Sequence, residues 1–245
     1  MNKFTGLVRR CIEDYGMIAD GETIAVGVSG GKDSIALLCA LADLRRYYPK
    51  RFELHSVTLG MGFDGMDFSP VEKLCSELKV PYTLHRTDLG KMVIYDRKEK
   101  NPCSLCAKMR RGAIHDVVKG LGIGKVALAH HYDDAVETFL LSLVFEGRIN
   151  CFQPVTYMDR SEVVQIRPLL YVGEGTIGRL IRDQGLPVVE NTCPRNGVSK
   201  REEVKELLKT LSKTYPDLRT KIFGAMQRFP LEGWGTSSSM RRPPP

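Results

Sequence analysis

The sequence lacks the long hydrophobic runs that would place it in a membrane. Its longest wholly apolar stretch, Ile35 to Ala42, is far short of the roughly 20 residues needed to cross a bilayer. Charged residues at positions 9, 10, 13 and 14 interrupt the N-terminal region, which excludes the apolar core of a signal peptide. We therefore expect a cytoplasmic protein without a membrane partner.

The composition gives no sign of disorder or of a fibrous repeat. The chain has 245 residues, of which 42% are hydrophobic and 27% are charged, close to the averages of globular domains. It is long enough to bury a core without disulfide bonds and to form one large or two small domains. Lys and Arg outnumber Asp and Glu by 36 to 29, which gives a formal charge of +7. This moderate excess favours a polyanionic partner such as nucleic acid.

Short apolar runs of strand type alternate with helical segments along the chain. We expect strands at residues 22–28, 52–59, 81–85, 125–129 and 163–167. We expect helices at residues 33–46, 69–78, 109–121 and 133–145. This alternation predicts an α/β fold with a parallel sheet covered by helices on both faces. A ligand should then bind beyond the carboxyl ends of the strands.

The chain is expected to have four parts. An N-terminal helix occupies residues 1–18, and the main domain occupies residues 19–198. Residues 199–228 are rich in Lys and Glu and predict one or two helices, broken near Pro216. The tail of residues 229–245 has no apolar period, so we expect it to be disordered.

A glycine- and lysine-containing loop follows the first expected strand, with the sequence Ser29-Gly30-Gly31-Lys32-Asp33-Ser34. Glycines let backbone N–H groups approach an anion, the start of a helix favours negative charge, and Lys32 adds a cation. The loop therefore predicts a phosphate site. It is not a Walker A loop, which would need Gly at Val26 and Ser or Thr at Asp33. A simple tight turn is the alternative, but it leaves the Lys-Asp pair unexplained.

A second glycine motif, G-x-G-x-x-G, spans residues 60–65. In a dinucleotide site the third glycine lies inside the helix that the motif opens. Here the helix start signal, Ser69-Pro70, comes only four residues after the motif. We therefore interpret the segment as a loop at the rim of the site rather than as a nicotinamide site.

Two histidines and two carboxylates follow the strand expected at residues 125–129, in the order His130-His131-Tyr132-Asp133-Asp134. Acidic residues in the first turn of a helix are stabilised by its dipole, which is sufficient to explain Asp133 and Asp134. It does not explain adjacent histidines at the end of a strand. A carboxylate at this place can hold the Mg²⁺ that accompanies ATP, since Mg²⁺ is usually bound by one or two carboxylates and phosphate oxygens.

Seven cysteines are an odd number, and in a reducing cytosol they fill cores, bind metals or carry out redox chemistry. Cys103 and Cys106 form the one Cys-x-x-Cys of the chain. A structural zinc site normally needs a second pair, and a redox pair is expected near an early βαβ unit. The remaining possibility is a metal site that a cysteine distant in the sequence completes, and Cys193 is the best candidate for it. Three cysteines around a [4Fe-4S] cluster leave one iron open to bind sulfide.

The phosphate loop resembles the signature of the PP-loop ATP pyrophosphatases, which split ATP between the α and β phosphates and attach AMP to a substrate oxygen. The resemblance implies that Ser29, Gly30, Gly31, Asp33 and Ser34 contact ATP, and that Thr58 and Leu59 meet the adenine through backbone groups. It also implies a Rossmann-like, doubly wound parallel sheet of the adenine nucleotide alpha hydrolase-like type.

Four motifs in this order resemble the tRNA 2-thiocytidine synthetase family, a group of tRNA sulfurtransferases, over about residues 20 to 200. They are the phosphate loop, Pro102 to Gly112, His130 to Thr138 and Ile166-Arg167-Pro168-Leu169. The family's G-H-x-x-D-D-x-x-E-T block has Ala129 in place of its glycine. The resemblance implies Asp33, His130, Asp133 and Asp134 as catalytic residues. It also implies Cys103, Cys106 and Cys193 as cluster ligands, although the residues after Cys193 differ from the family pattern.

The implied reaction activates a base carbonyl oxygen, such as that at cytidine C2, with AMP and then displaces AMP with sulfur. Its cofactors are ATP, Mg²⁺ and a [4Fe-4S] cluster, with a Cys103 persulfide as the alternative sulfur carrier. Its partners are tRNA and a sulfur donor, either a cysteine desulfurase persulfide or inorganic sulfide, and a homodimer is a further expectation. Candidate contacts to RNA phosphates, which can equally be solvated surface charges, are Lys108, Arg110, Arg111, Arg148 and Arg167. Two other functions stay open: a PP-loop ligase with a zinc-bound Cys-x-x-Cys, and a nucleotide-binding RNA module without turnover.

Overall fold

The computed structural model describes residues 2–97, 102–194, 200–228 and 231–235. Within them, six strands form one sheet in the order β3-β2-β1-β4-β6-β5. Their bounds are β1 (Glu22–Gly27), β2 (Phe52–Gly60), β3 (Tyr82–Arg86), β4 (Lys125–Ala127), β5 (Val155–Met158) and β6 (Val163–Ile166). The five expected strands are confirmed and pair in parallel. The sheet is not wholly parallel, however, because the unexpected β5 pairs antiparallel with β6 at the edge.

Helices cover both faces of the sheet because side chains of a strand alternate between faces. On β1, Ile24 and Val26 belong to one buried cluster, and Ala25 belongs to the other. The larger cluster packs α1 (Asn2–Asp14), α2 (Lys32–Leu44), α3 (Ser69–Glu77) and α7 (Glu174–Gln184) on one face. On the other face lies α5 (Pro102–Gly120), through Ile114 and Val118. This is the doubly wound arrangement that the sequence predicts.

α5 begins seven residues before the expected helix at residues 109–121. Its first residue is Pro102, and proline is tolerated there because the first N–H groups of a helix have no partner within it. Cys103 and Cys106 therefore lie on the first turns of a helix, three residues apart and on one side of it. A short helix, α4 (Leu89–Lys91), and a π-helical turn (Met92–Asp96) precede the undescribed residues 98–101.

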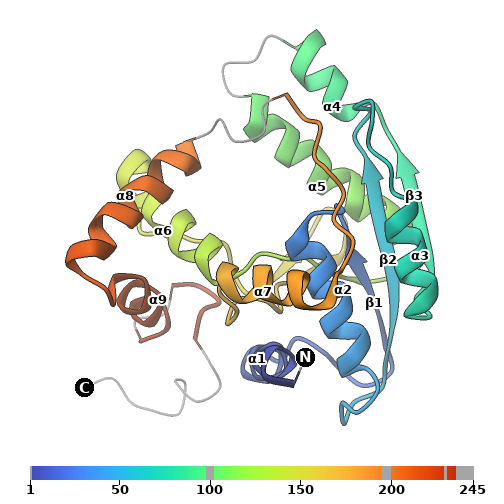
Figure 1. Cartoon of the computed structure of the whole chain (residues 1–245), viewed down its shortest axis with the longest axis horizontal. Helices are drawn as coiled ribbons and strands as arrows, with labels where there is room; N and C mark the ends of the chain where they lie inside the picture. The colour runs from blue at the N-terminus through green and yellow to red at the C-terminus, as the bar shows by residue number, and fades with distance from the viewer. Residues whose placement is uncertain (1, 98–101, 195–199, 229–230, 236–245) are drawn as a thin grey trace.

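Three helices form a lobe beside the sheet (Figure 1). They are α6 (Tyr132–Glu146), α8 (Lys200–Thr214) and α9 (Leu218–Arg228). The last two confirm the predicted C-terminal helices, with the break at residues 215–217. The unexpected helix of the fold is α7, whose sequence contains glycines at positions 175 and 178 that weaken helix propensity. It forms nevertheless because Ile177 and Leu180 are buried in the core.

The prediction of disorder from residue 229 is wrong for Trp234, which is completely buried. Its indole N–H donates a hydrogen bond to the carbonyl of Phe152 at 2.8 Å, and its ring contacts that of Phe223 at a centroid distance of 5.3 Å. One large aromatic ring buries enough surface to hold a segment that has no periodic pattern. Residues 229–230 and 236–245 of the predicted tail lie outside the described residues.

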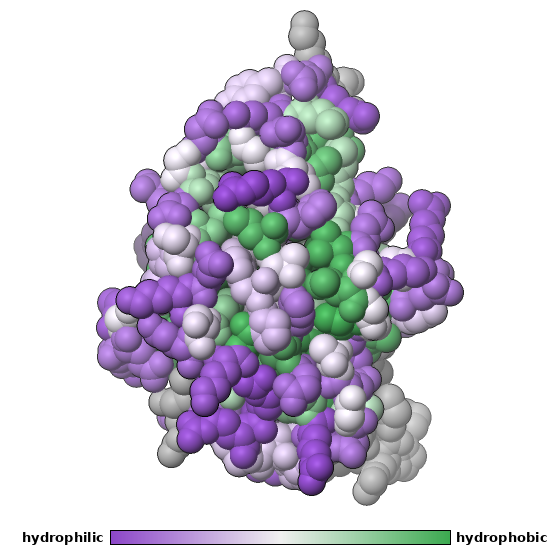
Figure 2. Space-filling model, turned by 90° about the vertical axis from the view of Figure 1, so that its right-hand side faces the viewer, coloured by the Kyte–Doolittle hydropathy of each residue, from purple (hydrophilic) through white to green (hydrophobic). Residues whose placement is uncertain are grey.

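Across the described ranges, no helix is long and apolar enough to cross a membrane. Figure 2 shows the surface at the right-hand side of Figure 1, where hydrophilic side chains predominate and apolar ones gather near the middle.

Candidate active site

A cavity of about 510 Å³ opens where β1, β2 and β4 end. This volume is in the range of small-molecule and cofactor sites. Its lining comes from the loops after these three strands, from the side of α5, from residues 189–193 and from the start of α8. The cavity therefore lies beyond the carboxyl ends of parallel strands, as the fold predicts.

The phosphate loop contributes Ser29, Gly31, Asp33 and Ser34 to the cavity. Ser34 Oγ donates to the Gly31 carbonyl at 2.8 Å and accepts from the Ser29 N–H at 3.2 Å, so the loop is held by its own hydroxyl. The N-cap of α2 is Gly31, which provides no side-chain cap. The first N–H groups of α2 are therefore available to an anion.

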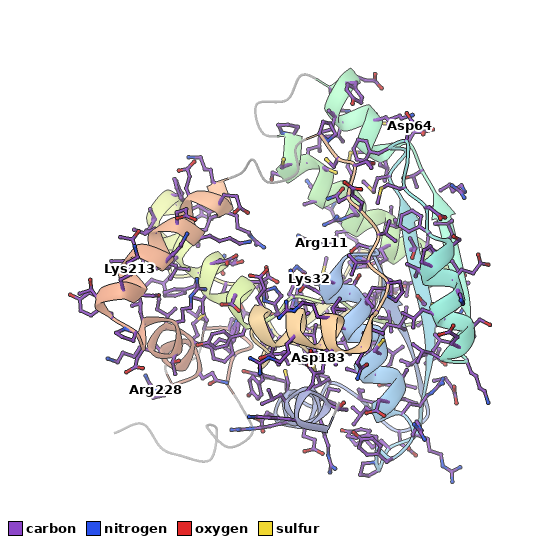
Figure 3. All side chains as sticks on the ribbon, viewed as in Figure 1. Lys32, Asp64, Arg111, Asp183, Lys213 and Arg228 are labelled. Atoms are coloured by element: carbon purple, nitrogen blue, oxygen red, sulfur yellow. The ribbon has the colours of Figure 1, made fainter. Side chains whose placement is uncertain are left out.

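The Lys32 side chain points away from the phosphate site to which the sequence assigns it. Its side chain does not line the cavity. Its Nζ lies 2.9 Å from Glu174 Oε1 on α7 and 3.2 Å from Asp33 Oδ2. Burial by itself would lower the pKa of Lys32, but the hydrogen bond to Glu174 and the two carboxylate charges outweigh it and raise the pKa. Figure 3 shows Lys32 beside α7, below Arg111 of α5.

The two adjacent carboxylates at the start of α6 point to different partners. Asp134 lines the cavity, where Oδ1 accepts from Arg201 at 2.8 Å and Oδ2 accepts from the His131 N–H at 3.0 Å. Asp133 does not line it: Oδ1 accepts from Arg219 at 2.9 Å, and Oδ2 accepts from the Glu174 N–H at 2.8 Å. The catalytic role predicted for Asp133 stays a prediction: its two oxygens hold α9 and α7, as the two oxygens of Asp134 hold α8 and the His131 backbone.

His130 lines the cavity as expected. Burial lowers its pKa well below the ordinary value, and the charges of nearby arginines lower it further, so the ring is neutral at pH 7. His131, for which the sequence predicts no role, is only 5% exposed. Its Nε2 lies 3.4 Å from Asp134 Oδ2 and 3.8 Å from Asp33 Oδ1, so it stands between the two cavity carboxylates.

Asp33 offers an atom suited to a cation. Its Oδ1 is buried and accepts no hydrogen bond from the residues that the structure describes. Asp33 and Asp134 both line the cavity, next to the phosphate loop. One or two carboxylates together with phosphate oxygens are the usual ligands of Mg²⁺. The donor set therefore fits a magnesium ion that arrives with a nucleotide.

The cysteines lie at the other side of the same cavity. Cys106 and Cys193 line it, and Cys103 is exposed on the preceding turn of α5. Burial is the main cause of the raised pKa of Cys106; Arg110 opposes the shift, and the charges of Cys193 and Cys103 add to it. Cys106 thus interacts electrostatically with each of the other two thiols. In the described part of the chain, no three His, Cys, Asp or Glu side chains are close enough to hold a single metal ion.

Residues 186–194, which we call the strap, connect the thiols with the phosphate loop. The Val189 N–H donates to the Gly30 carbonyl at 2.9 Å, and Thr192 Oγ1 donates to the carbonyl of Asp64 at 2.9 Å. A Cβ on Gly30, whose φ is +85°, would lie 2.7 Å from Val189 Cβ. Glycine at position 30 is therefore needed for the strap to pack, and the strap places Cys193 at the cavity.

The predicted RNA contacts are found in three environments. Arg110 and Arg111 line the cavity, and Lys108 is exposed on the same helix. Arg148 is exposed beyond the end of α6 and does not line the cavity. The environment of Arg167 does not favour the predicted RNA contact, because the residue is only 5% exposed and donates to the Gln153 carbonyl and to Thr156 Oγ1.

Apolar side chains form one wall of the cavity. Leu59, Met61 and Phe63 line it, so the segment with the G-x-G-x-x-G motif lies at the cavity as predicted. Thr58 is completely buried, and its hydroxyl donates to the Val28 carbonyl at 2.7 Å. Its side chain thus joins β2 to the start of the phosphate loop and does not face the cavity.

Comparisons with known proteins agree with this geometry. A family model described as a PP-loop domain matches residues 3–210. A tRNA-cytidine(32) 2-sulfurtransferase from Geobacter sulfurreducens is 37% identical over 230 residues, which are 91% of this chain and 88% of that protein. The protein of that name from Dechloromonas aromatica is 35% identical over 228 residues, 91% of this chain and 78% of that protein.

Among solved structures, the U34-tRNA thiolase NcsA from Methanococcus maripaludis, determined with its [4Fe-4S] cluster, has a TM-score of 0.74. The match has 22% sequence identity and covers 90% of this chain and 75% of that chain. At this identity the likeness shows a shared fold.

Proposed function

Because this chain belongs to the PP-loop family and to its tRNA-sulfurtransferase branch, we propose that it replaces an oxygen of a tRNA base, the 2-oxygen of a cytidine, with sulfur at the expense of ATP. One observation carries the proposal: the phosphate loop, two carboxylates and two thiols all open on one cavity. The names of its relatives support cytidine as the substrate base.

The first step needs ATP held with its α phosphate accessible to the base. The N–H groups at the start of α2 and the hydroxyl of Ser29 bind the phosphates, and Leu59 and Phe63 contact the adenine. The carbonyl oxygen of the base attacks the α phosphorus, the bond to the bridging oxygen breaks, and pyrophosphate leaves with the electron pair. Fixed N–H donors stabilise the negative charge that grows on the phosphates.

Asp33 and Asp134 would hold Mg²⁺ in this step, and the ion would neutralise phosphate charge. The two residues also have roles of their own. Asp134 orients the His131 backbone and the guanidinium of Arg201, and His131 fills the space between the two carboxylates. His130 is neutral, so it adds no positive charge to the site.

The second step needs sulfur beside the activated carbon. Cys103, Cys106 and Cys193 would hold a [4Fe-4S] cluster, and that group would supply the sulfur-transfer chemistry of this step. The sulfur attacks C2, and AMP leaves with the former base oxygen. Arg110 favours the thiolate of Cys106, and the strap fixes Cys193 relative to the phosphate loop. Arg110 and Arg111 in the cavity lining and the exposed Lys108 on the same helix would contact tRNA phosphates.

Anaerobic purification with an absorption spectrum and an iron count tests the thiol site. We expect an iron-sulfur spectrum for the wild type and its loss in Cys193→Ala, while Cys75→Ala, a buried core cysteine of α3, retains it. Nucleoside analysis of tRNA from a deletion strain tests the reaction and should show loss of a thiolated cytidine. A colourless, zinc-loaded protein and unchanged thionucleosides would exclude the proposal.

A further inference from the structure

Arg201 reaches the cavity from outside the sheet domain. It is the second residue of α8, which is anchored in the core by Val204 and Leu208. Its side chain lines the same cavity as Ser29, Asp134 and Cys193. The C-terminal lobe therefore adds a cation to a site otherwise built from strand ends, α5 and the strap.

Two contacts hold the Arg201 guanidinium in one orientation. One terminal nitrogen donates to Asp134 Oδ1 at 2.8 Å, and the other donates to Thr138 Oγ1 at 3.2 Å. These bonds use two of the five N–H donors of the group. The side chain remains 38% exposed and lines the cavity, so three N–H donors are not used by these two contacts.

The chain provides a matched arginine with a different location. Arg219 on α9 donates to Asp133 Oδ1 at 2.9 Å, as Arg201 donates to Asp134 at 2.8 Å. Both arginines thus tie a C-terminal helix to adjacent carboxylates of α6. Arg201 lines the cavity, and Arg219 does not. A purely structural role would be shared by both residues, whereas contact with a ligand is available only to Arg201.

Arg201 is one of three arginines that line the cavity, and unlike Arg110 and Arg111 of α5 it is bonded to Asp134. Lys32, the cation of the loop itself, does not line the cavity and is paired with Glu174 and Asp33. Asp33 and Asp134 place negative charge beside the loop, where a triphosphate would bring more. A rigid guanidinium fork matches phosphate oxygens in geometry and in charge.

Building on the function proposed above, we propose that Arg201 is a catalytic residue that binds a non-bridging phosphate oxygen of ATP. As the base oxygen forms its bond to the α phosphorus and the bond to pyrophosphate breaks, negative charge grows on the phosphate oxygens and on the leaving group. Arg201 stabilises that charge, and Asp134 and Thr138 hold it in place. No proton or further reactant is required for this role.

The test compares Arg201→Gln, Arg201→Lys and Arg219→Gln with the wild type in the full chain. Binding of α,β-methylene ATP and of adenosine is measured by equilibrium dialysis, and tRNA-dependent pyrophosphate release is measured at saturating ATP. Arg201→Gln should weaken analogue binding roughly tenfold to hundredfold, as for a lost charged hydrogen bond, and leave adenosine binding unchanged. Its pyrophosphate release should fall by about 10²–10³, and Arg201→Lys should remain slow because it lacks the fork. Arg219→Gln should match the wild type in both measurements.

Three results would overturn the assignment. Equal losses in Arg201→Gln and Arg219→Gln would indicate a structural role. Wild-type turnover in Arg201→Lys would show that only the charge beside Asp134 matters. A third result would assign Arg201 to an RNA phosphate: unchanged analogue binding together with weaker tRNA binding. The slope of log tRNA affinity against log salt concentration would then be lower by about one phosphate contact. Failure of the wild type to release pyrophosphate would refute the reaction instead, and the analogue-binding comparison would still decide whether Arg201 contacts phosphate.

Discussion

Replacing Glu137 with glutamine should remove a pH dependence from the stability of this protein. Glu137 lies on α6 and is only 2% exposed, and its Oε2 accepts no hydrogen bond from any described residue. Burial is the main cause that raises its pKa from 4.5 to about 7; Asp134 adds to the shift, and Lys205 opposes it. The carboxyl group is therefore stabilised in its neutral form by the fold.

The magnitude follows from linkage between protonation and folding. The folded state binds the proton more tightly than the unfolded state, so the favourable contribution is complete below about pH 4.5 and is lost as pH rises through about 7. A pKa difference of about 2.5 corresponds to roughly 3 kcal/mol of the free energy of unfolding, which is lost by the alkaline end of this pH range. Between pH 5 and 8, the free energy of unfolding of the wild type should fall by about 2 to 3 kcal/mol relative to that of Glu137→Gln.

Urea unfolding at several pH values measures this difference. Fluorescence of Trp234, the one tryptophan and a completely buried one, reports the transition. Glu206→Gln, in an exposed ion pair with Lys209 on α8, serves as the control and should show a nearly constant difference from the wild type. A difference between wild type and Glu137→Gln that does not change with pH would refute the argument from burial.

Three further changes test contacts around the cavity. Gly30→Ala should weaken binding of α,β-methylene ATP and lower the free energy of unfolding by about 1–3 kcal/mol, because φ is +85° and Val189 leaves no room for a Cβ. Values equal to those of the wild type in equilibrium dialysis and in urea unfolding would contradict this. Trp234→Ala should cost about 3–5 kcal/mol in urea unfolding followed by circular dichroism, and a loss below 1 kcal/mol would show that the C-terminal contact is not needed. Glu174→Gln should release Lys32 toward the phosphates and tighten analogue binding at low salt, whereas weaker binding would show that the ion pair organises the loop.

Local patterns were sufficient to predict the five parallel strands of the sheet and the segments that border the cavity. The apolar run of β1 and the glycines after it specify both a buried strand and an open phosphate loop, because these features depend on residues next to each other in sequence. The partner of Lys32 could not be predicted in this way. It lies on α7, a helix whose glycines hide its pattern and whose formation depends on burial against α2. Trp234 was missed for a similar reason, since its contacts come from elements distant in the chain.

The adjacent carboxylates of α6 show why motif and role differ. Successive residues of a helix point about 100° apart, and of the two carboxylates only Asp134 lines the cavity. Asp134 faces it and receives Arg201 from α8. Asp133 faces away, where Arg219 of α9 and the first N–H of α7 use both of its oxygens. The pair therefore joins the C-terminal lobe to the site through two ion pairs, of which only that of Asp134 and Arg201 lines the cavity. A sequence motif specifies that both carboxylates are present, but the helix register decides which of them is available for chemistry.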